Sequence, residues 1–218
     1  AYSSTIKDWS GNANHGTITG ATWTRLSSGL WVLYFDGIDD RVSINDADNL
    51  SFGNSSTDSP FSILAWVKTT NYTLNRTIIS KENIAGGQRE WNFQFLDDST
   101  IRLLIFDPTP GAQVTRVGTA PSAGVWHLVG ATYDGGGGAT AANGIILYVD
   151  GAVLSSTASN NASYVAMENL TAPVYVGNRI DLDVDYLGHI ALPRVLSGVR
   201  SASQMLNDLN QERHLFGI

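Results

Sequence analysis

The chain has 218 residues, 22 glycines, no cysteine and a formal net charge of −7. An acidic surface repels the phosphate backbone of nucleic acids, so we expect no nucleic-acid partner. The longest apolar stretches, such as 144–149, are about six residues long, whereas a membrane-spanning helix needs roughly 20, so we expect no membrane insertion. The absence of cysteine excludes disulfides, a thiol nucleophile and cysteine-bound zinc.

The composition predicts a single folded domain over residues 1–218. Hydrophobic residues make up 43% of the chain and charged residues 15%, and a chain of this length can bury roughly 70% of the surface that it exposes when unfolded. All-β sandwiches commonly reach this length as one unit. No proline-rich or charged linker divides the sequence.

Short segments rich in Val, Ile, Thr and aromatic residues recur along the whole chain, separated by Gly, Asn, Asp and Ser. This pattern is typical of an antiparallel sandwich or barrel and indicates about 13 strands. The segment 61–69 has apolar side chains on both faces, which predicts a central strand. The clearest strands are expected at 17–24, 31–35, 61–69, 76–80, 90–96, 101–106, 113–118, 126–133, 145–149, 153–156, 174–177 and 188–195.

Two local signals sharpen this prediction. Asp150-Gly151 provides the positive φ angles of a two-residue type I′ turn, which predicts a hairpin over 145–156. Ser201 and Gln204 fit a capping box, and apolar residues at helical spacing then predict a short helix that docks on the sandwich. These apolar residues are Met205, Leu206 and Leu209, and the apolar tail beyond them, which closes the fold or contacts a neighbouring subunit, contains Leu215, Phe216 and Ile218.

Six segments, in the same order along the chain, resemble one protein family. They are DWSGNANHGTITGATWT (8–24), YFDGIDDRVSI (34–44), FSILAWVKT (61–69), TIISK (77–81), GVWHLVGATYDG (124–135) and ILYVDGAVL (146–154). They are similar to the laminin-G-like, concanavalin A-like jelly-roll modules of bacterial, phage and extracellular proteins. The resemblance implies an all-β, two-sheet antiparallel sandwich with a short C-terminal helix, located outside the cell, on a cell surface or on a virion.

In this family, an FDG-x-D-D loop often lies beside a structural calcium ion, and the matching loop here contains Asp36, Asp39 and Asp40. Ca²⁺ takes six to eight oxygen ligands, which carboxylates provide. The alternative is a turn whose carboxylates cap backbone N–H groups. Relatives have an acidic pair near the C-terminus where this chain has Ala191-Leu192, so a calcium ion held by that pair would be weakened or relocated here.

Two further segments have oxygen ligands at alternate positions. Asp181, Asp183 and Asp185 would project to one side of an extended segment, where they form either a calcium-binding rim or a solvated loop. The second segment contains Asp8, Ser10, Asn12 and Asn14 but lacks the bidentate glutamate of an EF-hand loop. A turn capped by side chains is therefore expected at 8–14.

Sugar binding needs a flat aromatic ring and nearby polar groups, because a pyranose is apolar on its C–H faces and polar at its edges. Trp91 beside Arg89 fits this description, although an alternating strand would equally place Trp91 in the core. Tyr186 also fits. The candidate polar ligands around Tyr186 are Asn178, Arg179, Asp181 and Asp183.

The sequence contains no catalytic pattern. Glycosidases of this fold use two carboxylates on one strand, and the four glutamates of this chain are too far apart in sequence to form such a pair. The four histidines are scattered, and none has a neighbouring serine or cysteine elbow. His127 is expected to be a packed strand residue. We therefore expect no enzyme and assign no catalytic residue.

Two hypotheses of function follow. The first is a non-enzymatic glycan-binding module, lectin-like and assisted by calcium, whose ligand is a glycan or another extracellular surface ligand. The second is a structural or adhesion module of a virion or cell surface that binds protein partners or assembles with itself. The C-terminal helix and its apolar tail motivate the second hypothesis.

Overall fold

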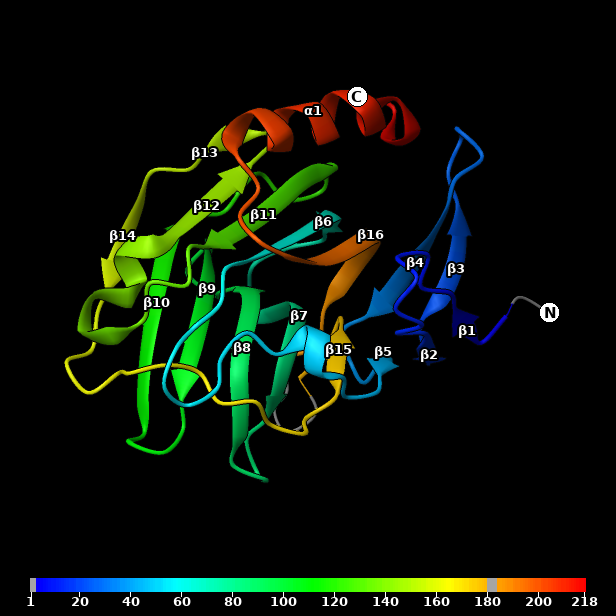
Figure 1. The fold of residues 1–218 in the computed structure, drawn as a ribbon. Helices are drawn as coiled ribbons and strands as arrows, with labels where there is room; N and C mark the ends of the chain where they lie inside the picture. Colours follow the sequence, from blue (N-terminus) through cyan, green and yellow to red (C-terminus); the bar gives the residue numbers. More distant parts are fainter. Residues whose placement is uncertain (1–2, 180–183) are drawn as a thin grey trace.

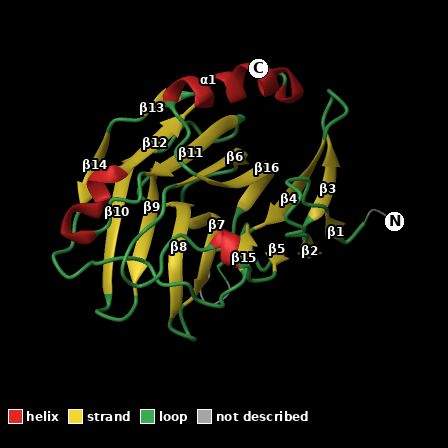
Figure 2. Ribbon diagram, viewed as in Figure 1, coloured by secondary structure: helices red, strands yellow, loops and turns green. Residues whose placement is uncertain are grey.

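The structure is a computed structural model that describes residues 3–179 and 184–218. Its strands form two stacked antiparallel sheets, as Figure 1 and Figure 2 show. The nine-stranded sheet has the order β1 (Thr5–Ile6), β2 (Gly16–Thr19), β5 (Arg41–Ile44), β15 (Val174–Val176), β7 (Arg76–Asn83), β8 (Gln88–Phe95), β9 (Thr100–Asp107), β10 (Ala112–Thr119) and β14 (Ser156–Ser159).

The seven-stranded sheet has the order β13 (Ala152–Val153), β12 (Ile145–Val149), β11 (His127–Tyr133), β6 (Phe61–Thr69), β16 (Leu187–Ser197), β4 (Trp31–Asp36) and β3 (Thr22–Arg25). Strand β6 lies between β11 and β16, so the predicted central strand is confirmed. The hairpin at Asp150-Gly151 is confirmed too, with φ values of 49° and 74° at these residues. The predicted all-β sandwich is therefore the observed fold.

Two predicted strands are wrong because each one is split between the sheets. The segment 17–24 contains the end of β2 and most of β3, which belong to different sheets. Gly20 separates them with a φ of 77°, a conformation that residues with a Cβ rarely adopt. The segment 153–156 is divided in the same way between β13 and β14. Hydrophobic alternation does not reveal such a crossing, since it continues on both sides.

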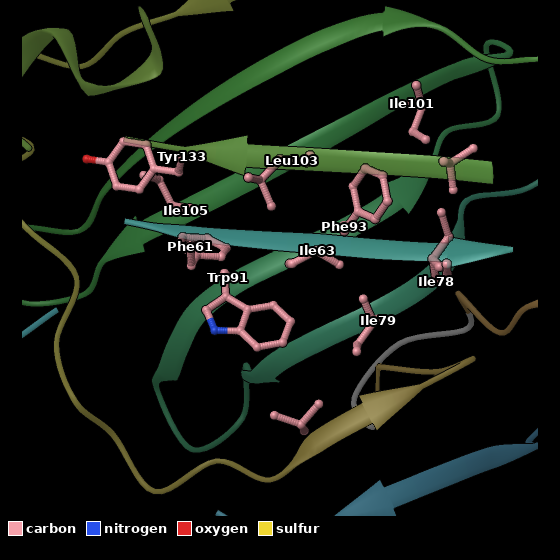
Figure 3. Packing of buried hydrophobic residues seen from close by; sticks show 14 of the residues in the cluster. Phe61, Ile63, Ile78, Ile79, Trp91, Phe93, Ile101, Leu103, Ile105 and Tyr133 are labelled. Atoms are coloured by element: carbon pink, nitrogen blue, oxygen red, sulfur yellow. The ribbon is translucent and has the colours of Figure 1, made fainter. Parts of the chain in front are cut away.

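The main core lies between the two sheets and consists of the inward-facing side chains of both. Figure 3 shows Trp91 and Phe93 of the nine-stranded sheet packed against Phe61 and Ile63 of β6. The short 3₁₀ helix η1 (Asp48–Leu50) contributes Leu50 to the same core. Close packing of aromatic and branched side chains makes this layer the main apolar burial of the fold.

The core includes both aromatic residues that the sequence suggested as sugar-stacking platforms. Trp91 and Tyr186 each have 0% exposure, and Trp91 Nε1 donates to Leu50 O at 3.1 Å. A ring without exposed surface cannot stack on a sugar, so this prediction is wrong for both residues. Strand alternation directs Trp91 inward, which is the alternative that the sequence left open.

A second apolar cluster lies on the other side of the seven-stranded sheet. Helix α1 (Ala202–Glu212) begins at the predicted capping box of Ser201 and Gln204 and lies across this sheet in Figure 1. A short 3₁₀ helix, η3 (Arg213–Phe216), follows, and Phe216 stacks on Trp66 with ring centroids 4.1 Å apart. Leu215 packs on the same cluster, so this part of the tail closes the fold.

Among the described residues, no helix is long and apolar enough to cross a membrane.

Strand β16 accommodates a proline in the interior of the sheet. Its register with β6 shifts between Ala191 and Arg194, and its pairing with β4 ends at Ile190. Leu192 has a φ of 47° at this irregularity. Proline has no N–H to donate to a neighbouring strand, and such a bulge is one of the places where a sheet tolerates it. Pro193 follows this residue in the sequence.

A buried lysine joins three separate segments at the rim of the sandwich. Lys81 has 0% exposure, and its ammonium donates to Glu90 Oε1 at 2.7 Å and to Asp46 Oδ1 at 2.7 Å. It also reaches the carbonyl oxygens of Leu170 at 2.7 Å and Ala172 at 3.0 Å. Burial raises the pKa of the Glu90 carboxyl, and the Lys81 charge opposes that rise. The ion pair therefore compensates a charge that the core could not hold alone.

We expect Lys81→Met to destabilise the fold by about 3–5 kcal/mol, because it leaves the Glu90 carboxylate buried without a counter-ion. Urea unfolding followed by tryptophan fluorescence measures the change. The double variant K81M/E90Q removes both charges and should recover part of the loss. An unchanged midpoint for K81M would contradict the role given to this ion pair.

We expect Trp91→Ala to cost about 3–5 kcal/mol, since it opens a large cavity in the main core. The matched control is Trp9→Ala. Trp9 is 88% exposed, so its removal should change stability by less than about 0.5 kcal/mol. Thermal melts of both variants compare the two effects, and equal melting temperatures would show that the core assignment of Trp91 is incorrect.

Candidate functional site

Two of the predicted ligand-binding residues, Arg89 and Arg179, come together on the outer face of the nine-stranded sheet. We use "outer face" for the side of this sheet that points away from the seven-stranded sheet. Both guanidinium groups contact the carboxylate of Glu82 on β7. Asp181 and Asp183 lie outside the described residues.

Strand alternation creates this polar face. On β8, Trp91, Phe93 and Phe95 point into the core. Asn92 and Gln94, which alternate with them, therefore point outward. On β9, Leu103 and Ile105 point inward in the same way. The outward residues of β9 are Arg102, Leu104 and Phe106, and the register places Arg102 opposite Gln94 and Leu104 opposite Asn92.

Glu82 is the centre of the hydrogen-bond network on this face. It has 0% exposure and accepts hydrogen bonds from Arg89 Nε at 2.6 Å, Asn92 Nδ2 at 2.9 Å and Arg179 Nη1 at 3.4 Å. Three donors satisfy the buried carboxylate, as burial of a charge requires. Glu82 therefore fixes the positions of two arginines, one from β8 and one from the segment after β15.

A third arginine completes a group that we call the outer arginine cluster, which consists of Arg89, Arg102 and Arg179. Burial lowers the pKa of the Arg102 guanidinium, and the positive charges of Arg179 and Arg89 lower it further, while Glu82 and Asp98 raise it. The guanidinium carbon of Arg89 lies 3.7 Å from the ring centroid of Phe106, a cation–π contact that favours this position of the side chain.

The polar atoms of this cluster are only partly used within the protein. Arg179 is 6% exposed, and its Nε is buried without a hydrogen-bond partner among the described residues. Gln94, with its amide oriented so that both ends find partners, accepts from Arg102 Nη2 at 2.8 Å. The side chain of Arg89 keeps 31% of its surface exposed. In the described part of the chain, the outer face therefore combines one buried, unpaired N–H of Arg179 with a partly exposed Arg89 beside a fixed network.

Asn178 was also predicted to bind ligand, but its side-chain amide donates to the carboxylate of Asp185 inside the protein. Its backbone carbonyl accepts from Ser80 Oγ at 3.2 Å, and Arg76 Nη1 donates to Asp185 O at 2.8 Å. Asn178 is 6% exposed. These contacts hold the segment that presents Arg179, so the structure gives Asn178 a positioning role in place of direct ligand contact.

Asp36, Asp39 and Asp40 form a compact acidic cluster, with carboxylate oxygens within 4.8 Å of one another. Two of these carboxylates also cap the turn: Asp36 Oδ1 accepts from Ile38 N at 2.9 Å, and Asp40 Oδ2 accepts from Asp36 N at 2.8 Å. Burial raises the pKa of the Asp40 carboxyl, and the charges of Asp36 and Asp39 add to this rise. A cation would relieve the repulsion, so the donor set fits a calcium ion.

Ala191 and Leu192, at the positions of the family's acidic pair, lie further along β16 than the residue that pairs with Asp36. Ala191 packs in the cluster beneath helix α1, while Asp36 pairs with Leu187 at the start of β16. A strand rises about 3.3 Å per residue, so the positions of Ala191 and Leu192 lie more than 10 Å along the strand from Asp36. Carboxylates there could not bind the same ion as Asp36.

The predicted side-chain-capped turn at 8–14 is present and displays an aromatic residue that sequence reasoning missed. Asp8 Oδ1 accepts from Ser10 N at 2.8 Å, and Asp8 Oδ2 accepts from Asn14 N at 3.0 Å. The turn holds Trp9 with 88% of its surface exposed. Asn14 donates to the side chain of Asn49, so the polar groups beside Trp9 are used to hold the loop.

A hydrogen-bonded chain of serine, histidine and aspartate was also missed. Ser122 Oγ lies 3.1 Å from His127 Nε2, and His127 Nδ1 lies 2.7 Å from Asp150 Oδ2. Asp150 Oδ1 accepts from Leu128 N at 3.0 Å, and Gly124 N, two residues after the serine, donates to Thr69 O. The chain joins the loop before β11 to the turn after β12, and Ser122 is exposed on that loop. These hydrogen bonds hold the loop and the turn together, which agrees with the expected packed position of His127.

Comparisons with known proteins agree with this architecture. Among curated proteins, none matches the chain significantly. Solved structures do match. The binding domain of Paraclostridial mosquitocidal protein 1 has a TM-score of 0.70 at 14% identity, covering 97% of this chain and 50% of that one. The ligand-binding domain of botulinum neurotoxin serotype D, in complex with N-acetylneuraminic acid, has a TM-score of 0.65 at 13% identity, with coverages of 95% and 50%. This chain thus spans about half the length of these two domains.

A third match covers both chains almost entirely. It is domain 4 of AbnA, a GH43 extracellular arabinanase from Geobacillus stearothermophilus, in complex with arabinotriose, with a TM-score of 0.63, 19% identity and coverages of 92% and 91%. At these identities the likeness establishes the fold alone. The family model that matches residues 35–205 is described as "Concanavalin A-like lectin/glucanases superfamily". This chain therefore belongs to the concanavalin A-like lectin/glucanases superfamily.

Proposed function

We propose that this protein is a non-enzymatic, lectin-like module that binds a glycan outside the cell, on the outer face of its nine-stranded sheet. The observation that supports this site is the convergence of Arg89 and Arg179 on Glu82, with Asn92 and Arg102 beside them. Sugar hydroxyls are recognised by fixed donors and acceptors, and a rigid sheet holds such groups accurately.

The similar structures support the ligand class. One of them is a domain of an extracellular arabinanase with bound arabinotriose, and another is a toxin domain with bound N-acetylneuraminic acid. Two of the three reported matches are described as binding domains, and the third is an arabinanase domain in complex with arabinotriose. They favour saccharide binding by this chain, and their low identity leaves the choice of sugar to its own residues.

The outer face is a better candidate than the loop that displays Trp9. An exposed indole provides a stacking surface, but sugar recognition also needs polar groups at the ring edge. The side chains next to Trp9 hold the loop together, since Asp8 accepts from Ser10 and Asn14. In the outer arginine cluster, the Nε of Arg179 has no hydrogen-bond partner in the part of the chain that the structure describes.

The alternative hypothesis, an assembly or virion module, has less support in the tertiary structure. Its sequence basis was the apolar C-terminal tail, and Phe216 in that tail is 8% exposed and stacks on Trp66. A side chain that closes its own fold does not provide a docking surface. Ile218 remains 45% exposed, which is ordinary for a single surface residue.

Calcium assistance forms a second part of this proposal. Asp36, Asp39 and Asp40 would provide oxygen ligands, and a bound ion would neutralise three neighbouring carboxylates. The loop follows β4, which forms part of the sandwich. The ion would therefore stabilise the loop after β4.

The first prediction concerns binding itself. The purified chain should bind a defined subset of sugars on a glycan array in millimolar calcium, because the outer face presents fixed hydrogen-bonding groups. A parallel array in EDTA separates calcium-dependent from calcium-independent recognition. Binding to no glycan in either buffer would contradict the proposed function, and an assembly role would then be tested by measuring molar mass against protein concentration.

The second prediction concerns the ion. Calcium should raise the melting temperature of the wild-type chain, and Asp40→Asn should abolish this rise. The pKa of Asp40 is raised in the folded state, so its ionised form opposes folding at neutral pH. In EDTA at pH 7, D40N should therefore be more stable than wild type, and the difference should shrink as the pH falls through the folded pKa of Asp40. Equal calcium responses in both proteins would exclude this site.

A further inference from the structure

We propose that the outer arginine cluster binds the anionic group, a carboxylate or a sulfate, of an acidic saccharide. This inference rests on the proposed glycan-binding function and specifies its ligand class. It is based on the excess of cations at one place on the outer face, on their fixed geometry and on a buried donor that lacks a partner.

The first observation is a local imbalance of charge. Arg89, Arg102 and Arg179 interact with one another and with a single carboxylate, Glu82, with a weaker contribution from Asp98. Counted over residues 3–179 and 184–218, three guanidinium groups against the one carboxylate in direct contact leave a local excess of two positive charges. The chain as a whole has a net charge of −7, so this cluster is of opposite sign to the rest of the protein.

The second observation is that the internal carboxylate is already saturated. Both oxygens of Glu82 accept hydrogen bonds, one from Arg89 and the other from Asn92 and Arg179. Glu82 holds these cations in place and has no exposed surface. Among the described residues, no second carboxylate contacts these arginines directly, so an anionic group of a ligand would neutralise the remaining positive charge.

The third observation is a donor without an acceptor. Arg179 is more than nine-tenths buried, and within residues 3–179 and 184–218 its Nε has no hydrogen-bond partner. A buried N–H left unpaired costs free energy, which an incoming oxygen would recover. Guanidinium groups present paired N–H donors whose spacing matches carboxylate and sulfate oxygens, and the ring of Phe106 keeps Arg89 in one orientation.

The chemistry of the surroundings favours a sugar acid over a neutral sugar or a long polyanion. A neutral sugar would leave the mutual repulsion of the three arginines in place, whereas a single charged group would relieve it. A long polyanion would be repelled by the acidic remainder of the surface. The site should therefore prefer short saccharides with one or a few charged groups.

The test is isothermal titration calorimetry of the full chain with three short saccharides: trigalacturonic acid for a carboxylate, a sulfated galactose oligomer from carrageenan for a sulfate, and neutral galactotriose. We expect binding of at least one charged oligomer and much weaker binding of galactotriose. A charge-assisted hydrogen bond contributes about 1.5–3 kcal/mol, so Arg102→Gln or Arg179→Gln should weaken that binding roughly 10- to 100-fold. Arg102→Lys should weaken it less, because it keeps the charge but loses the planar donor pair.

The matched control is Arg25→Gln, which removes one exposed arginine from β3 in the other sheet and should leave the affinity unchanged. Melting temperatures confirm that each variant is folded, and R102K provides a second reading if R102Q is unstable. Binding of charged oligomers that R102Q and R179Q do not weaken would overturn this inference. Binding of galactotriose and other neutral glycans alone would overturn it too and leave the proposed function intact. Binding of no saccharide here or on the array would overturn both.

Discussion

The burial of one ammonium group holds the rim of this sandwich together. Lys81 has no exposed surface and reaches oxygens of Asp46, Glu90, Leu170 and Ala172. These oxygens come from the connection after β5, from β8 and from the chain before β15. A buried ammonium has to be fully paired, so these segments are constrained to meet at one point.

The same strands, β7 and β8, provide side chains to both the inner and the outer face of the nine-stranded sheet. Residues of β8 alternate between core positions such as Phe93 and outer positions such as Asn92, and the register with β7 shifts between Lys81 and Glu82. At this irregularity Lys81 is directed to the buried ion pair and Glu82 to the outer arginines. A β-bulge redirects side chains in this way. Here it places the buried Lys81 ion pair next to the candidate binding face.

The fold alone does not identify a ligand, because the superfamily's sandwich serves many functions and the similar structures share less than 20% of residues with this chain. The argument for a glycan rests on side chains that point out of the sheet. The outer arginine cluster and the acidic loop at Asp36 have opposite charge, so they suit different partners: an anionic group at the first and a cation at the second. Each can be weakened by one substitution at a residue outside the main core.

The sequence by itself determined the all-β class, the central position of 61–69, the turn at Asp150-Gly151 and the capped helix after Ser201, because each depends on local geometry or on periodicity. Resemblance to a family supplied the sandwich topology. Only the tertiary structure decided which aromatic rings are buried. Trp91 and Trp9 are the same residue type, and their exposure differs because of the residues that pack around each one in the fold. The tertiary structure also decided that Arg89 and Arg179 meet at Glu82 with Arg102 nearby, because strand register and the path of the chain after β15 bring together residues that are far apart in the sequence.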